Sequence, residues 1–199
     1  MDALKKSSVD KNPFKQFESW YNEILKSDIK EPSAMTLSTA SRKGVPSVRT
    51  VLLKGFDEAG FLFFTNYESK KGRELIQNPV AELLFYWMDF DRQVRISGKV
   101  EKTSNEESEK YFISRPLQSR IGAWASKQSE IIPNREYLEK RFVEFEKKFK
   151  NYIPLPPNWG GFRLIPGKFE FWQGRENRLH DRIVYLKKDQ EWETVRLSP

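Results

Sequence analysis

The chain has 199 residues, one histidine and no cysteine, which excludes disulfides, thiolate metal sites and cysteine nucleophiles and leaves too few ligands for a transition-metal site. Its formal net charge of +7 favours anionic partners, but the basic residues are dispersed among acidic ones, so we do not expect nucleic acid as a partner. No apolar run approaches the roughly 20 residues that span a bilayer, and no apolar signal core follows the first residues, so we expect a cytoplasmic protein that does not bind membranes.

The first half of the sequence predicts one helix followed by closely spaced strands. Residues 1–12 are polar and are expected to form a mobile N-terminal arm. Asn12-Pro13 is a typical helix start, with Asn as the cap and Pro at the first helical position, and apolar side chains keep helical spacing up to Leu25. Strands are expected at 34–40, 48–56, 61–65, 80–87 and 93–102, and a short helix at 69–77. The short turns between the strands indicate an antiparallel sheet or barrel.

The hydrophobic period changes after residue 102. Ser104 and Glu107 form a capping box for a helix at 106–114, and Pro116 starts a second helix after a break. The clearest helix is predicted at 134–150, a stiff loop at 153–161, and further strands at 162–166, 168–172, 181–187 and 191–197. Together these elements predict one α+β domain over residues 13–199.

The segment from Trp172 to Arg182 contains the only histidine, His180, with Arg178 and Arg182 two residues away on either side. If this segment is extended, these three side chains share one face, and they repel one another unless an anion lies in front of them. This pattern points to a phosphorylated ligand, and the alternative is a solvated basic strand. Alternation also turns Asp181 away from His180, which argues against a Ser-His-Asp triad.

Two further groups of basic residues are candidates for anion binding. Arg49 and Lys54 lie in a predicted strand, where alternation places them on opposite faces, and the alternative is that they are strand-end charges that reach water. Lys70 and Lys71 lie at a predicted helix start, a few residues after Thr65 at the end of a predicted strand. The hydroxyl, the backbone N–H groups of the helix start and the positive charge together suit a phosphate. Exposed lysines at a helix start are the alternative there.

Polar side chains around the helix break form two more candidate groups. Tyr111, Arg115 and Ser119 are spaced i, i+4, i+8, and two helices bent at Pro116 would bring them together around a phosphate. A second set, Gln93, Gln128 and Ser129, offers neutral donors and acceptors for a heterocycle. The alternative for this second set is polar capping of a loop.

Several motifs, in matching order and spacing from about Asn12 to Pro199, resemble the pyridoxamine (pyridoxine) 5′-phosphate oxidase family. They are Arg49–Lys54, Ser69-Lys-Lys71, Arg92-Gln93, Tyr111-Phe-Ile-Ser-Arg-Pro116, Ile121-Gly-Ala-Trp124, Ser126-Lys-Gln-Ser129, Trp159-Gly-Gly-Phe162, Phe171-Trp-Gln-Gly174 and Arg178-Leu-His-Asp-Arg182. The resemblance implies an FMN-binding split β-barrel, antiparallel and Greek-key-like, with peripheral helices. It also implies a homodimer with FMN sites at the subunit interface.

The same resemblance implies roles for individual residues. FMN would be bound by Arg49, Thr50, Val51, Leu52, Leu53, Lys54, Phe64, Thr65, Lys70, Lys71, Gln93, Gln128, Ser129, Trp172 and Arg182. The substrate phosphate would be held by Lys54, Tyr111, Arg115 and Ser119. Arg178 and His180 would be the catalytic residues that contact the pyridine ring near the reacting carbon, and Leu179 would lie between them in the substrate-binding segment.

The implied reaction oxidises pyridoxamine or pyridoxine 5′-phosphate to pyridoxal 5′-phosphate, with O2 as the electron acceptor and H2O2 as a product. The sequence departs from the family pattern at Phe64, where Tyr is frequent, and at Lys70, where Arg is common and would bind phosphate in a more bidentate way. The N-terminal arm is short and lacks an Arg-x-x-Tyr element that often helps to cover the substrate.

Two other classes of protein remain as alternatives. One is a non-catalytic protein on the same barrel that binds FMN or a vitamin B6 phosphate, although the presence of Arg178, His180, Tyr111 and Arg115 argues against it. The other is a basic barrel that binds nucleic acid, and a yellow purified protein with bound flavin would argue against that reading.

Overall fold

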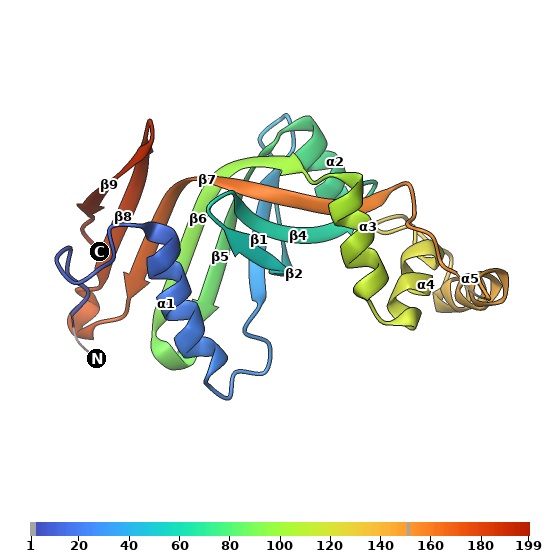
Figure 1. Ribbon diagram of the computed structural model, residues 1–199, viewed down its shortest axis with the longest axis horizontal. Coiled ribbons are helices and arrows are strands. Elements are labelled where there is room, and N and C mark those ends of the chain that lie inside the picture. Colours follow the sequence, from blue (N-terminus) through green and yellow to red (C-terminus); the bar gives the residue numbers. More distant parts are fainter. Residues whose placement is uncertain (1–2, 151) are drawn as a thin grey trace.

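A curled antiparallel sheet of nine strands organises the molecule (Figure 1). The computed structural model describes residues 3–150 and 152–199. The strand order is β2-β1-β5-β6-β7-β4-β3, and β8 and β9 extend the sheet beside β7. The strands are β1 (Ala34–Ala40), β2 (Pro46–Leu52), β3 (Gly55–Asp57), β4 (Gly60–Asn66), β5 (Val80–Trp87), β6 (Arg92–Lys102), β7 (Trp159–Gln173), β8 (Asp181–Lys188) and β9 (Glu191–Arg196). The α+β class with an antiparallel sheet is confirmed.

Five α-helices accompany this sheet in the described part of the chain. They are α1 (Pro13–Leu25), α2 (Lys70–Gln77), α3 (Asn105–Ser114), α4 (Leu117–Ala125) and α5 (Arg135–Lys148). The predicted start of the first helix is confirmed, because the side chain of Asn12 accepts a hydrogen bond from the backbone N–H of Phe14 (2.9 Å). The predicted helices at 106–114 and 134–150 are confirmed with end points shifted by one or two residues.

Helix α1 fills the concave side of the sheet with aromatic side chains. Phe17, Trp20 and Ile24 are buried on one face of the helix. The Phe17 ring lies edge-on to Phe61 and to Phe85, with ring centroids 5.0 Å apart in both cases. The high aromatic content of the sequence therefore supplies the core between α1 and the sheet.

Strand β7 is one continuous strand where the sequence predicts a loop and two shorter strands. One of its edges pairs with β6 along its length, while the other pairs first with β4 and then with β8. The register shifts between Ser97 and Gly98 of β6, where a β-bulge accommodates the change. A Cβ atom on Gly98 would overlap the backbone oxygen of Ile165, so the close approach of the two strands requires glycine there.

The predicted strand at 48–56 is in fact two strands separated by Leu53 and Lys54. The backbone N–H of Leu53 donates to the oxygen of Ser33 (2.8 Å), whereas that of Lys54 donates to the oxygen of Leu62 (2.8 Å). The chain therefore changes neighbours within one residue, from the side of β1 to the side of β4. Strict side-chain alternation ends at this point.

Helices α3, α4 and α5 gather at one end of the molecule, and the hairpin β8–β9 lies at the opposite end (Figure 1). A second apolar cluster holds these helices against the start of β7 through the buried side chains of Phe112, Ile121, Ile153 and Trp159. The long strand β7 runs from one end of the molecule to the other and connects the two regions.

Residues 3–12 lie against the folded domain, in the region predicted to be a mobile arm. The backbone N–H of Leu4 donates to Asp181 Oδ2 (3.0 Å), and the hydroxyl of Tyr185 donates to the oxygen of Asp10 (2.6 Å). The side chain of Leu4 is buried in the main core. The arm is thus anchored to β8, and its mobility stays a prediction.

Candidate active site

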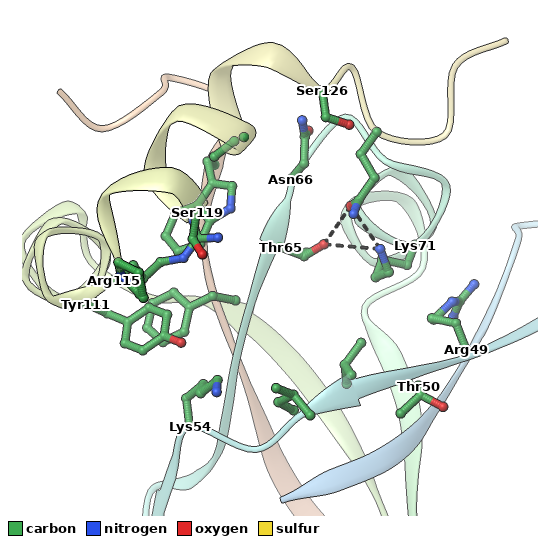
Figure 2. A pocket seen from close by; sticks show the side chains of 18 residues that line it. Arg49, Thr50, Lys54, Thr65, Asn66, Lys71, Tyr111, Arg115, Ser119 and Ser126 are labelled. Carbon is green, nitrogen blue, oxygen red and sulfur yellow. Dashed lines mark hydrogen bonds between the residues drawn. The ribbon is translucent and has the colours of Figure 1, made fainter. Parts of the chain in front are cut away.

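A central pocket of about 800 Å³ opens between the strands β2 and β4 and the helices α3 and α4 (Figure 2). Its volume lies within the range of small-molecule sites. It is lined by Arg49, Thr50, Val51, Leu52, Lys54, Phe64, Thr65, Asn66, Lys71, Tyr111, Arg115, Pro116, Ser119, Gly122, Ala123, Ser126, Gln128 and Trp159. Thus most residues that the resemblance assigns to cofactor or substrate phosphate converge on one cavity.

One corner of the central pocket is built around the buried ammonium group of Lys71. Its Nζ donates to Thr65 Oγ1 (3.2 Å), Gln128 Oε1 (3.1 Å) and Ser69 Oγ (3.4 Å), all of which are neutral oxygens. Burial, and then the nearby charge of Arg49, lower the pKa of Lys71. No carboxylate pairs with this ammonium group among the described residues. An anion in this corner would therefore find a cation that the protein itself leaves unneutralised.

The opposite wall of the pocket carries Tyr111, Arg115 and Ser119, as Figure 2 shows. Tyr111 lies on α3, Ser119 lies on α4, and Arg115 is in the break between the two helices. The predicted convergence across the bend at Pro116 is confirmed. Burial lowers the pKa of Arg115, and its Nη1 atom is buried with no hydrogen-bond partner in the described structure. A buried guanidinium nitrogen without a partner fits an anionic ligand.

Three aromatic rings lie nearly parallel on this wall of the pocket. The centroids of Phe64 and Tyr111 are 4.0 Å apart, and those of Phe64 and Trp159 are 5.5 Å apart. The guanidinium of Arg115 lies 4.8 Å from the Trp159 ring centroid. Trp159 was given no role from the sequence, although it begins the Trp-Gly-Gly motif. In that motif a Cβ on Gly161 would approach Thr103 Oγ1 to 2.6 Å, so glycine lets β7 run close to this wall.

Arg49 and Lys54 both line the central pocket, so the prediction that they lie on opposite faces of one strand is wrong. The break after β2 removes the alternation on which that prediction rested. Leu53, the residue at this break, is buried in the main core and is absent from the lining. Lys70 and Ser129 line an adjoining pocket of about 380 Å³ that shares Arg49, Lys71 and Gln128 with the central one.

The segment around His180 lies outside the central pocket. Asn177 and Arg178 have positive φ angles of 55° and 61°, so residues 176–178 form a turn and the extended face predicted for Arg178 and His180 does not exist. His180 stacks at a tilt on Trp172, with ring centroids 4.7 Å apart. The backbone N–H of Arg175 donates to His180 Nδ1 (3.1 Å), which fixes the orientation of the ring.

Arg182 is engaged in an ion pair with a buried carboxylate. Its Nε donates to Glu170 Oε1 (2.8 Å), and the buried carboxylate of Glu170 also pairs with Arg95. Leu179 is 70% exposed. Trp172 and His180 line a separate pocket of about 810 Å³ together with residues 89–91 and 173–176.

Within one chain, the candidate residues therefore form two groups. None of Gln93, Trp172, Arg178, His180 and Arg182 is among the described residues that line the central pocket. Strand β8 and helix α4 lie at opposite ends of the molecule (Figure 1). A site that uses both groups has to be completed by a second copy of the chain.

Comparison with known proteins decides the family. A family model described as "Pyridoxamine 5'-phosphate oxidase" matches residues 22–149, and one described as "Pyridoxine 5'-phosphate oxidase C-terminal dimerisation region" matches residues 159–199. The chain belongs to the pyridoxamine 5′-phosphate oxidase family. Curated proteins named pyridoxine/pyridoxamine 5′-phosphate oxidase are 56% identical in Trichormus variabilis and 54% identical in Paraburkholderia xenovorans, each over 100% of this chain and 94% of the relative.

Two solved structures resemble this chain. The structure of PhzG from Burkholderia lata 383, in complex with tetrahydrophenazine-1-carboxylic acid, matches with a TM-score of 0.93 and 30% identity over 100% of this chain and 99% of that one. An FMN-binding protein from Nostoc punctiforme, related to pyridoxamine 5′-phosphate oxidase, has a TM-score of 0.75 and 20% identity over 94% and 98% of the two chains, and shares the fold.

Family membership supports an oxidase with a flavin cofactor, and the matched dimerisation region supports a homodimer. Among the described helices, none is long and apolar enough to cross a membrane.

Proposed function

We propose that this protein is an FMN-dependent oxidase that converts pyridoxamine or pyridoxine 5′-phosphate to pyridoxal 5′-phosphate, with O2 as the final electron acceptor and H2O2 as a product. One observation carries this proposal. The central pocket has two cationic walls: Arg49 and Lys71 lie on one, and Lys54 and Arg115 lie on the other together with a group of aromatic rings. Two such walls suit two phosphates, one on the cofactor and one on the substrate.

The residues around Lys71 fit the phosphate end of FMN. Lys71 is a buried cation with neutral partners, and Arg49 lies beside it in the same pocket. Lys70 and Ser129 reach the adjoining pocket that shares both cations, so they would contribute from its other side. The residues Thr50 to Leu52, Thr65 and Gln128 would line the remainder of the cofactor site.

The opposite wall fits the substrate phosphate. Arg115 has a buried guanidinium nitrogen that lacks a partner in the described structure, and Tyr111 and Ser119 supply single hydroxyl groups beside it. Lys54 would add a flexible charge from the break after β2. Each charge-assisted hydrogen bond to the phosphate would contribute on the order of 1.5–3 kcal/mol.

The second group of residues would come from the partner subunit. Gln93, Trp172 and Arg182 would complete the flavin site, and Arg178 and His180 would contact the substrate ring. The family's C-terminal dimerisation region covers residues 159–199, which includes four of these five residues. The site would then lie at the interface of the homodimer, and we expect the dimer to act in the cytoplasm.

The difficult chemistry would belong to the cofactor, since FMN when bound supplies the acceptor for the hydride that leaves the C4′ carbon of the substrate. The chain's own residues hold the two phosphates, orient the substrate ring and exclude water from the pocket. Because the cofactor would supply the reactive group, the reaction needs no cysteine nucleophile, and the chain contains no cysteine.

Aerobic turnover of pyridoxamine 5′-phosphate with added FMN tests the proposal, with pyridoxal 5′-phosphate and H2O2 measured together. We expect the two products in equal amounts and much slower turnover of pyridoxamine without its phosphate. Absence of product from a flavin-loaded dimer would refute the oxidase function. Equal turnover of the phosphorylated and unphosphorylated amines would refute the assignment of the Arg115 wall.

A further inference from the structure

Glu74 is a buried carboxylate next to the cations of the central pocket, and neither the sequence motifs nor the family assignment gives it a role. Its side chain is 9% exposed. Glu74 Oε2 accepts a hydrogen bond from Thr39 Oγ1 (2.5 Å), and Oε1 accepts one from Ser47 Oγ (2.8 Å). Burial alone would raise the pKa of Glu74, but these hydrogen bonds and the charges of Arg49 and Lys70 outweigh it and lower the pKa. Glu74 is therefore ionised, and it lies beside Arg49, which lines the pocket where an anionic ligand is expected.

The same carboxylate holds the guanidinium of Arg49. Glu74 Oε2 lies 3.4 Å from Arg49 Nη2. Arg49 Nη1 donates to Thr39 Oγ1 (2.6 Å), to the backbone oxygen of Leu37 (3.1 Å) and to that of Ser47 (3.1 Å). One edge of the guanidinium is thus fully engaged by the protein, and Thr39 bonds both the arginine and the carboxylate. The arginine is held in one orientation before any ligand arrives.

Lys71 and Glu74 are three residues apart on α2 and lie on neighbouring positions of one helix face. Lys71 points into the corner with Thr65 and Gln128, while Glu74 faces β1 and β2. One turn of helix α2 therefore supplies the cation of Lys71 to the pocket directly. Through the carboxylate of Glu74, the same turn also holds a second cation, Arg49.

We propose that Glu74 is a positioning residue that orients the Arg49 guanidinium toward the phosphate of FMN, a role that rests on the proposed FMN site. The opposing effect is electrostatic, because a carboxylate near a phosphate repels it. If charge alone mattered, removing the carboxylate would tighten FMN binding. If positioning dominates, removing it weakens binding, because Arg49 loses the partner that orients it. The sign of the change in affinity separates the two effects.

The experiment compares the dissociation constants of FMN and riboflavin for the wild-type dimer and for Glu74→Gln, by quenching of flavin fluorescence. Riboflavin lacks the phosphate, so its affinity reports the remainder of the pocket. We expect Glu74→Gln to raise the Kd of FMN about tenfold, the order expected when one charge-assisted hydrogen bond is lost, and to leave the Kd of riboflavin unchanged. A merely structural role would weaken both ligands alike.

Glu107→Gln is the matched control. Glu107 Oε1 also pairs with an arginine, Arg163 Nη2, at 2.7 Å, and it does not line the central pocket. We expect no change in either dissociation constant for this variant. If Glu74→Gln does not give a folded dimer, Ser47→Ala replaces it, since that change removes one hydrogen bond to the carboxylate and keeps the charge.

The possible results distinguish this inference from the proposed function. Tighter or unchanged FMN binding by Glu74→Gln, or by Ser47→Ala where that variant replaces it, would overturn the positioning role. A wild-type dimer that binds riboflavin as tightly as FMN would instead refute the phosphate site itself. Selective loss of FMN affinity in the variant, with wild-type preference for FMN intact, would support both.

Discussion

At the scale of single residues, the proposed phosphate sites rest on cations that are at least partly buried and have no acidic partner in the described part of the chain. Lys71 has three neutral oxygens around its ammonium group, and Arg115 has a guanidinium nitrogen with no partner in the described structure. Such groups reduce the stability of the free protein, since a buried charge costs free energy unless it is paired. A bound phosphate would pair with these cations, and removal of this cost would contribute to the affinity for the phosphate.

The lowered pKa of Lys71 predicts how FMN affinity depends on pH. A lysine whose pKa is lowered loses its proton at a lower pH than an exposed lysine, and the neutral amine no longer attracts a phosphate. The ratio of FMN affinity to riboflavin affinity should therefore fall as pH rises through this lowered pKa. In Lys71→Arg the guanidinium stays charged, so the ratio should stay flat over the same range. An equal decline in both proteins would contradict the role of Lys71.

Arg178 is predicted to act on turnover and not on flavin binding. Arg178→Ala should reduce kcat on the order of 100-fold, the typical cost of removing one electrostatic group from an active site, while flavin content per subunit stays near the wild-type value. Arg135→Ala, which removes an exposed arginine on α5, is the control and should leave both quantities unchanged. Loss of flavin from Arg178→Ala would show that this residue belongs to the cofactor site instead.

At the scale of elements, the change of partner along β7 creates the separation between the pocket and the C-terminal hairpin. The first half of β7 lines the pocket wall through Trp159, and the second half carries Trp172 beside β8. The bulge at Gly98 lets one strand serve both regions.

Two glycine-to-alanine substitutions at the bulge should distinguish the effect of steric overlap on stability from the effect of replacing a glycine as such. Gly98→Ala places a Cβ against the backbone of Ile165 and should lower the free energy of unfolding by about 2–4 kcal/mol. Gly167→Ala lies in β7 at the same bulge, and its Cβ would meet only the Ser97 oxygen at 4.0 Å, so it should change stability little. Urea unfolding of both variants measures this difference. Equal stabilities would contradict the importance of the close approach.

The sequence predicted elements well where the signal was local. The cap at Asn12 and the break at Pro116 were identified correctly because capping and proline geometry depend on adjacent residues. The division of residues 48–56 and the continuity of β7 were missed because both depend on which distant strand lies alongside. The same limit explains why the sequence wrongly predicts that Arg49 and Lys54 lie on opposite faces of one strand.

The sequence predicted which residues form the candidate site better than it predicted how these residues are arranged in space. The motifs named most residues of the central pocket, but the turn at Asn177, with its positive φ angle, gave no signal in the spacing around His180. Trp159 and Glu74 were missed, since neither holds a position that periodicity marks as functional. Their roles emerge only from packing between elements.

At the scale of the whole molecule, one chain carries the two groups of candidate site residues at its opposite ends. The pocket near α3 and α4 holds both cationic walls, to which we assign the two phosphates, and the region near β8 holds His180 and Arg178. The matched dimerisation region includes β8 and its neighbours. A two-fold dimer would bring each half of one chain to the other half of its partner.

Subunit mixing tests this account most directly. Arg115→Ala and Arg178→Ala homodimers should each be nearly inactive toward pyridoxamine 5′-phosphate, because every site contains one defect. After the two are unfolded and refolded together, activity should recover to about a quarter of the wild-type rate, since random assortment makes roughly half of the dimers mixed and each mixed dimer has one intact site. Recovery to this level would show that the phosphate wall of one chain works with Arg178 of the other. No recovery from folded, flavin-loaded mixed dimers would contradict a site shared between subunits.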